Sequence, residues 1–175
     1  DRTSYGHPLW LHGHILDVAN EAVGIDIYED GIEELQADGY DVHHGNAENF
    51  DIGDSFDIVV AAEVIEHLTN PSGFLKSVEK HLDSDGVLLI TTPNLHSLFV
   101  LGAYLSPFYT EKEHSIGFTP TILRNLLERC GWTVESLELI THEDIPNTGN
   151  NIINALVPKR LNFTIFCVAH PNNNK

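Results

Sequence analysis

The stretch from Phe56 to Leu68 constrains the fold of this 175-residue chain more than any other part of its sequence. It begins with β-branched and small apolar residues behind Asp57, a pattern typical of a parallel strand that is covered on both faces. It ends in two carboxylates and an imidazole, those of Glu63, Glu66 and His67. Because ligands of open α/β sheets lie beyond the carboxyl ends of the strands, the stretch predicts a functional site directly after a buried strand.

Strand-like and helix-like patterns alternate along the rest of the chain. Short apolar runs bounded by turn residues predict strands, and apolar residues three or four apart predict helices. The predicted strands are 22–27, 40–44, 57–62, 86–92, 132–140 and 161–169, and the predicted helices are 10–18, 29–38, 71–82 and 120–129. The alternation predicts an α/β, Rossmann-like fold with a mostly parallel sheet flanked by helices. Few residues suited to a crossover helix separate the last two strands, which are expected to form an antiparallel edge pair.

Length and composition indicate one folded domain. With 42% apolar residues the chain can bury a core of its own, and we expect a single domain over 1–170 and a polar tail at 171–175. No apolar run approaches the about 18 residues of a membrane span, and nothing at the start resembles a signal peptide. Cys130 and Cys167 match no metal spacing. They are typical of buried thiols in a reducing compartment, so a cytoplasmic location is expected.

The net charge of −17, from 26 acidic side chains and 9 Lys and Arg, argues against two classes of partner. Such a surface repels nucleic acid phosphates and anionic membranes. The acids are spread through the predicted elements rather than gathered in a tail, which argues against disorder. Adaptation to high salt is the favoured explanation, and an acidic face on a protein from an ordinary environment is the alternative.

Polar residues also follow the first two predicted strands. The carboxylate of Asp26 can accept hydrogen bonds from both hydroxyls of a ribose, or it can cap the helix that follows. The side chain of Asn46 can bond an adenine amino group while the neighbouring backbone N–H reads a ring nitrogen. The alternative at Asn46 is an ordinary turn. The residues alone leave both alternatives open.

Taken in order, five motifs resemble one known family. They are Gly24-Ile25-Asp26, Gly45-Asn46-Ala47-Glu48, the block from Asp57 to His67, Gly86 to Thr92 with Pro93-Asn94, and Gly117-Phe118-Thr119-Pro120 with Leu126-Leu127 and Gly131-Trp132. The motifs look like those of class I S-adenosylmethionine-dependent methyltransferases, closest to the branch that methylates oxygen atoms of small molecules. The resemblance implies S-adenosylmethionine as cofactor and a small-molecule acceptor. It also implies that the cofactor is bound by Asp26, Ile27, Asn46, Ala47 and Glu63.

The sequence departs from this family in one motif. The family's first strand ends in an acid-x-Gly-x-Gly loop that packs against the methionine part of the cofactor. Ile15 to Val18 imitates the start of that strand, but only about six residues separate it from Ile25, and a crossover with its helix takes at least about ten. We therefore assign Ile15 to Val18 to a helix and expect the first strand and its loop upstream of Asp1. A remnant that cannot hold the cofactor is the alternative. Asn46, where the family usually has Asp, is a milder departure.

The carboxylates and the imidazole after the third strand suggest how the acceptor is activated. Glu63, Glu66 and His67 are three and four residues apart, which places them on one face of a helical turn. With His114 as a fourth ligand they suit Mg²⁺, Mn²⁺ or Zn²⁺. This is similar to metal-assisted methyltransferases that act on vicinal hydroxyls, such as small-RNA 2′-O-methyltransferases and ubiquinone-pathway O-methyltransferases, in which the metal lowers the pKa of the acceptor hydroxyl. The metal-free alternative makes Glu66, His67 and His114 the catalytic residues, with a histidine as general base.

Three functions remain in competition at this point. The first is a methyltransferase that acts on an oxygen of a small molecule. The second is a methyltransferase-like module that binds a partner without catalysis, and the missing glycine loop favours it. The third is a nicotinamide-dependent dehydrogenase, which shares the acid at a strand tip but does not predict the Glu63-x-x-Glu66-His67 pattern. Aromatic residues between 95 and 113 form either a lid over the acceptor or a core helix with a loop.

Overall fold

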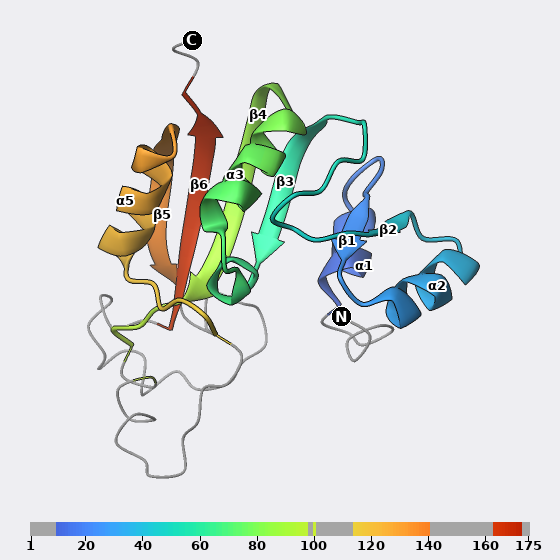
Figure 1. Cartoon of the computed structure of the whole chain (residues 1–175), viewed down its shortest axis with the longest axis horizontal. Helices are drawn as coiled ribbons and strands as arrows, with labels where there is room; N and C mark the ends of the chain where they lie inside the picture. Colours follow the sequence, from blue (N-terminus) through green and yellow to red (C-terminus); the bar gives the residue numbers. More distant parts are fainter. Residues whose placement is uncertain (1–9, 98–99, 101–113, 141–162, 173–175) are drawn as a thin grey trace. The chain divides into compact units, whose positions relative to one another are not determined.

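Figure 1 shows a computed structural model of the chain, in which residues 10–97, 100, 114–140 and 163–172 are described. The chain divides into two compact units, Asp1–Ile52 and Gly53–Lys175. The first holds a two-stranded sheet and the second a four-stranded sheet. Each unit is described by itself, and a single domain over 1–170 stays a prediction. None of the described helices is long and apolar enough to cross a membrane; the cytoplasmic location also stays a prediction.

The first unit contains one parallel pair of strands joined through a helix. Its elements are α1 (Leu11–Leu16), β1 (Gly24–Asp26), α2 (Glu29–Ala37) and β2 (Val42–His44). Strands β1 and β2 pair in register from Gly24 opposite Val42 to Asp26 opposite His44. The pairing is parallel because α2 carries the chain back to the starting end of the sheet. The carboxyl ends of the two strands therefore lie side by side.

Helix α1 is the first described element and begins at Leu11, directly after the first described residue. Ile15 and Leu16 belong to this helix, so the assignment of this segment to a helix rather than to a first strand is confirmed there. Aromatic packing fixes the start of α1, because the rings of Trp10 and Tyr40 lie 5.0 Å apart in an edge-to-face arrangement. The ring of His12 lies 6.1 Å from that of Tyr40. Residues 1–9, where the sequence begins, lie outside the described part.

The second unit is built on a mixed sheet. Its strands are β3 (Phe56–Ala62), β4 (Leu82–Pro93), β5 (Trp132–Ile140) and β6 (Thr164–Pro171), in the order β3-β4-β6-β5. Strand β3 runs parallel to β4, whereas β6 is antiparallel to both β4 and β5. The predicted antiparallel pair at the C-terminal edge is therefore confirmed, with β5 outermost. After β6, the backbone N–H of Asn172 donates to the carbonyl of Gly131 at 2.8 Å.

Helices α3 (Pro71–Lys80) and α5 (Pro120–Arg129) cover one face of this sheet (Figure 1). The core lies between them and the sheet. It is formed by alternate residues of the central strands and by the inner sides of the helices: Leu88, Ile90, Ile165, Cys167, Ala169, Phe74, Leu75, Val78, Leu123 and Leu127, all buried. The alternation is the expected pattern for a strand with one covered face, because successive side chains point to opposite sides.

Local signals in the sequence set the ends of both helices. Each begins with Pro at its first turn behind a side-chain cap, where Asn70 accepts from the backbone N–H of Gly73 at 3.1 Å and Thr119 accepts from that of Ile122 at 3.3 Å. Such caps satisfy backbone donors that have no partner inside the helix. After α5, Gly131 takes a φ of 85°, which ends the helix and turns the chain into β5.

Strand β3 differs from the prediction that both its faces are covered. Ile58 and Val60 are 53% and 40% exposed on the face that α3 and α5 do not cover. The reason is that the described helices of the second unit, α3 and α5, both lie over the opposite face; β3 is also outermost in its sheet, with β4 as its only partner among the described residues. Most of the predicted lid or core helix between residues 95 and 113 lies outside the described residues.

Candidate active site

The chain leaves β3 through a residue in an uncommon backbone conformation. Glu63 has a φ of 55° and is the only described residue other than glycine with a positive φ. Such a conformation costs on the order of 1 kcal/mol and is found preferentially at functional sites. The structure therefore differs from the predicted helical turn through Glu63. The turn is a short 3₁₀ helix, η1 (Ile65–His67), which begins after Glu63 has redirected the chain.

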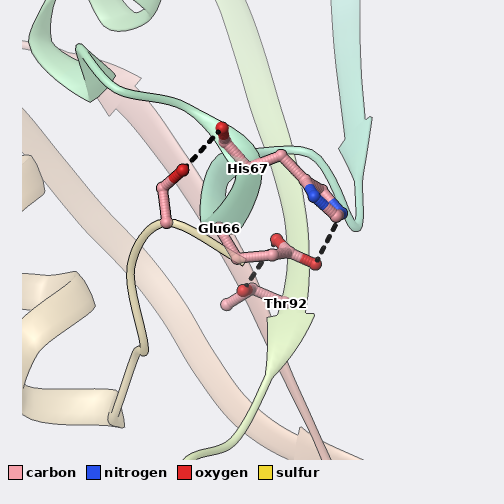
Figure 2. A network of polar contacts seen from close by, with 4 residues as sticks. Glu66, His67 and Thr92 are labelled. Carbon is pink, nitrogen blue, oxygen red and sulfur yellow. Dashed lines mark hydrogen bonds and ion pairs between the residues drawn. The ribbon is translucent and has the colours of Figure 1, made fainter. Parts of the chain in front are cut away.

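Glu66 is held in place by both its backbone and its side chain. Its side chain is 2% exposed. Its backbone carbonyl accepts hydrogen bonds from the N–H groups of Ser115 and Ile116, at 2.8 and 3.0 Å. Its carboxylate Oε2 accepts from the hydroxyl of Thr92 at 3.0 Å (Figure 2). The other oxygen, Oε1, is buried without a hydrogen-bond partner and lies 4.0 Å from Nε2 of His67.

The same segment brings His114 to His67. The Ser115 hydroxyl donates to the carbonyl of His67 at 3.3 Å, and the two imidazole rings lie 4.8 Å apart at an interplanar angle of 75°. Both histidines are exposed, whereas Glu66 is buried. One potential ligand atom from each of Glu66, His67 and His114 falls within 4.8 Å of the others. These three residues are named the Glu66–His67–His114 cluster below.

The charges of this cluster act on Glu63, but the side chain of Glu63 is not part of the cluster. Its backbone N–H donates to the carbonyl of Thr91 at 3.0 Å. Partial removal from solvent raises the pKa of its carboxyl group, and the negative charge of Glu66 raises it further, whereas a hydrogen bond from Thr91 and the two histidines oppose the rise. The group of side chains able to share one metal ion does not include Glu63.

The donor set of the cluster fits a divalent cation. It offers a buried carboxylate oxygen with no hydrogen-bond partner, and the ring nitrogens of two imidazoles face the same space. Three protein ligands with an open position are typical of catalytic zinc sites, and carboxylate oxygens also suit Mg²⁺ and Mn²⁺. The same arrangement fits metal-free proton transfer, because a carboxylate beside an imidazole stabilises the imidazolium that forms when the ring accepts a proton.

In the first unit, the residues predicted to bind adenosine lie at adjacent strand ends. Asp26 is the last residue of β1, and its carbonyl accepts from the N–H of Gly45 at 2.9 Å. The Asp26 carboxylate accepts from the N–H of Tyr28, the N-cap residue of α2, at 3.0 Å. The side chain of Asn46 accepts from the N–H of Glu48 at 2.8 Å, so a turn forms here. Neither bond uses up the acceptor capacity of its side chain.

The sequence interpretation missed Thr91 and Thr92, which bond to Glu63 and Glu66, and Ser115, which ties His114 to η1. A signal for the two threonines is present in the sequence. They are consecutive hydroxyl residues at the end of a strand that is otherwise apolar from Val87 to Ile90. A buried hydroxyl requires a partner, so the pair marks a polar environment at the strand end.

Comparison with known proteins assigns the family. A family model described as a methyltransferase domain matches residues 11–137. A probable S-adenosylmethionine-dependent methyltransferase of Mycolicibacterium smegmatis is 33% identical over 133 residues, which cover 73% of this chain and 49% of that protein. A ubiquinone biosynthesis O-methyltransferase of Bartonella quintana is 30% identical over 107 residues, 57% of this chain and 43% of that protein. The chain thus spans at most about half the length of these curated relatives.

A solved structure confirms the Rossmann-like fold. An S-adenosylmethionine-dependent methyltransferase from Clostridium acetobutylicum matches with a TM-score of 0.66 at 10% identity, covering 93% of this chain and 80% of that one. The family match also excludes the nicotinamide-dependent dehydrogenase. Because the methyltransferase model spans most of the sequence, the chain belongs to the class I S-adenosylmethionine-dependent methyltransferases.

Proposed function

We propose that this methyltransferase transfers the methyl group of S-adenosylmethionine to a hydroxyl oxygen of a small molecule, at the Glu66–His67–His114 cluster. The observation that carries the proposal is the buried Glu66 carboxylate, whose unbonded Oε1 lies 4.0 Å from the exposed imidazole of His67. A site for an oxygen acceptor must remove a proton, and this pair of groups is suited to that task. The similarity to a ubiquinone biosynthesis O-methyltransferase supports the same acceptor atom.

The reaction divides between positioning and proton transfer. In an in-line displacement the acceptor oxygen forms a bond to the methyl carbon while the bond from that carbon to sulfur breaks, which leaves S-adenosylhomocysteine. The protein contributes mainly by holding donor and acceptor in line. We infer that the ring of His67 accepts the hydroxyl proton and that the Glu66 carboxylate stabilises the resulting imidazolium. His114 lies against the ring of His67 and borders the same space.

A divalent cation is a second way in which this cluster can serve the same reaction. We propose Mg²⁺, Mn²⁺ or Zn²⁺ as the candidates, held by Glu66, His67 and His114, because the ligand atoms of these residues lie within 4.8 Å of one another. Glu63 was predicted as a further ligand, and it stays a prediction. A cation bound there would lower the pKa of a coordinated hydroxyl.

For the cofactor, we propose that Asp26 accepts hydrogen bonds from the ribose hydroxyls. Ile27, Asn46 and Ala47 would then contact the adenine. The adjacent carboxyl ends of β1 and β2 support this assignment, because ligands of open α/β sheets lie beyond such strand ends. Glu63, at the carboxyl end of β3, is proposed as a further cofactor contact. The glycine loop that the family places after its first strand completes such a site.

The acceptor class is tested with protein expressed from its whole reading frame. S-adenosylmethionine labelled in the methyl group is supplied with simple catechols, phenols, primary amines and thiols as separate acceptors, and labelled product is measured. Transfer to a hydroxyl compound is expected. Transfer confined to amines or thiols would overturn the oxygen assignment. Failure to bind S-adenosylhomocysteine at all would instead favour the non-catalytic binding module.

A further inference from the structure

Thr92 places a hydroxyl group inside the core of the second unit. The residue is fully buried in β4, on the face that α3 and α5 cover, and its partner across the sheet is the apolar Ile165. A buried hydroxyl without a partner is costly, and this one donates to Oε2 of Glu66 at 3.0 Å. The bond reaches from β4 to η1 and joins the sheet to the Glu66–His67–His114 cluster.

The backbone of Glu66 is already fixed by other bonds. Ser115 and Ile116 donate to its carbonyl, and η1 confines its φ and ψ angles. What these bonds leave undetermined is the rotation of the carboxylate. The hydroxyl of Thr92 determines it, because Oε2 is drawn toward β4 and Oε1 is thereby turned toward Nε2 of His67 (Figure 2).

The neighbouring threonine serves the other carboxylate. Successive side chains of a strand point to opposite faces, so Thr91 and Thr92 cannot reach the same group. Thr91 opposes the rise in the pKa of Glu63 through a side-chain hydrogen bond, whereas the hydroxyl of Thr92 donates to Glu66 at 3.0 Å. The two threonines at the end of β4 therefore act on different carboxylates.

We propose that Thr92 is a positioning residue of the active site, which orients the Glu66 carboxylate so that one oxygen faces the imidazoles of His67 and His114. Its effect on turnover rests on the proposed function, whereas its effect on geometry does not. Residues that orient a catalytic or ligating group by hydrogen bonding typically change metal affinity or activity by about 10- to 100-fold when they are replaced.

The test compares Thr92→Val, which removes the hydroxyl at nearly constant shape, with Thr92→Ser, which keeps it. Thr133→Val is the matched control, because Thr133 is an exposed residue of β5 that pairs with His170 and bonds to Asn172. The first readout is the imidazole nitrogen resonances of His67 and His114 at one fixed pH, assigned with His67→Gln and His114→Gln. The second is Mn²⁺ affinity, followed by the signal of free Mn²⁺ in electron paramagnetic resonance.

Thr92→Val should shift the resonances of both histidines and weaken Mn²⁺ binding by about tenfold or more, whereas Thr92→Ser and Thr133→Val should leave both readouts close to wild type. Unchanged histidine resonances in Thr92→Val, or equal shifts in the valine and serine variants, would overturn the proposal. If Thr92→Val does not fold, Thr92→Cys replaces it, since a thiol is a weak donor of similar size. If wild-type protein binds no Mn²⁺, the metal-bound form of the site is ruled out, and the histidine resonances still test the role of Thr92. A missing methyl transfer would count against the proposed function alone.

Discussion

The imidazole of His114 meets that of His67 edge to face, with ring centres 4.8 Å apart, although the two residues belong to segments that are distant in the sequence. The contact exists because Ser115 and Ile116 donate to the carbonyl of Glu66, one residue before His67. Backbone hydrogen bonds of the two residues that follow it therefore hold His114 beside His67. A change of either imidazole should leave the fold intact and alter the site.

Replacement of His67 or His114 by Gln distinguishes the two proposed forms of proton removal. If a divalent cation acts at the cluster, both variants should lose at least about tenfold in turnover, a chelator should abolish wild-type turnover, and Mn²⁺ should restore it. If His67 is a plain general base, only its variant should fall, by about 10²-fold or more, and the chelator should have no effect. Release of S-adenosylhomocysteine measures turnover, and His170→Gln on β6 is the control. Full activity in both variants would exclude the cluster from catalysis.

Asp26→Ala should weaken the binding of S-adenosylhomocysteine by at least about tenfold. The reason is that hydrogen bonds to a charged group contribute about 1.5–3 kcal/mol each, and the proposed site gives the ribose two of them. Titration calorimetry on protein expressed from the whole reading frame measures the affinity. Asp30→Ala is a suitable control, because Asp30 is an exposed acid in the first turn of α2. Equal affinities for wild type and Asp26→Ala would refute the ribose assignment.

Glu63→Gln should stabilise the protein at neutral pH, and the gain should disappear in acid. Partial desolvation and the charge of Glu66 raise the pKa of Glu63 above its ordinary value of 4.5, so ionising this carboxyl group disfavours the folded state. The loss of stability begins as the pH rises through about 4.5 and is complete above the folded-state pKa. Because Glu63 is substantially exposed, the difference in melting temperature should be small. Scanning calorimetry of both proteins over a pH series measures this difference in melting temperature. A difference that does not change with pH, or a variant less stable than wild type at neutral pH, would contradict the raised pKa of Glu63.

Rising KCl concentration should raise the melting temperature. A net charge of −17 on 175 residues repels itself most strongly in the compact state, and added ions screen this repulsion. Thermal unfolding followed by circular dichroism from low to molar KCl measures the effect. Melting temperatures are also compared in sodium sulfate and KCl at equal ionic strength. Equal increases indicate charge screening, whereas a larger increase in sulfate indicates a general salting-out effect. A flat or falling curve in KCl would count against salt adaptation.

Periodicity was sufficient to predict most elements of the fold. The helices α2, α3 and α5 and the strands β3, β4 and β5 fall within a few residues of their predicted ranges. The reason is local, since caps such as Asn70 and Thr119 and the stop at Gly131 act on their own segments. The extra length of β4, which starts at Leu82 rather than at the predicted residue 86, comes from pairing with β3, which no local pattern reports.

The site was predictable in its composition and not in its geometry. The spacing of Glu63, Glu66 and His67 indicated one helical turn, but a left-handed residue at Glu63 breaks the helical period before the turn begins. Likewise, the placement of His114 depends on hydrogen bonds between segments that are distant in the sequence, and the partner of Thr92 depends on how η1 crosses the end of β4. Contacts of this kind arise only once the sheet has formed.

The outer edge of β3 bears on how the protein behaves in concentrated solution. Among the described residues of the second unit no strand pairs with this edge, and the exposed Ile58 and Val60 lie beside it. Such an edge can template the addition of a strand from another molecule, which is a route to aggregation. At low ionic strength, the repulsion between chains of charge −17 opposes that encounter, and at high ionic strength it fades. Colloidal stability and conformational stability should therefore respond to salt in opposite directions, so that the salt concentration at which the fold is most robust is also the one at which self-association, followed by light scattering, is most favoured.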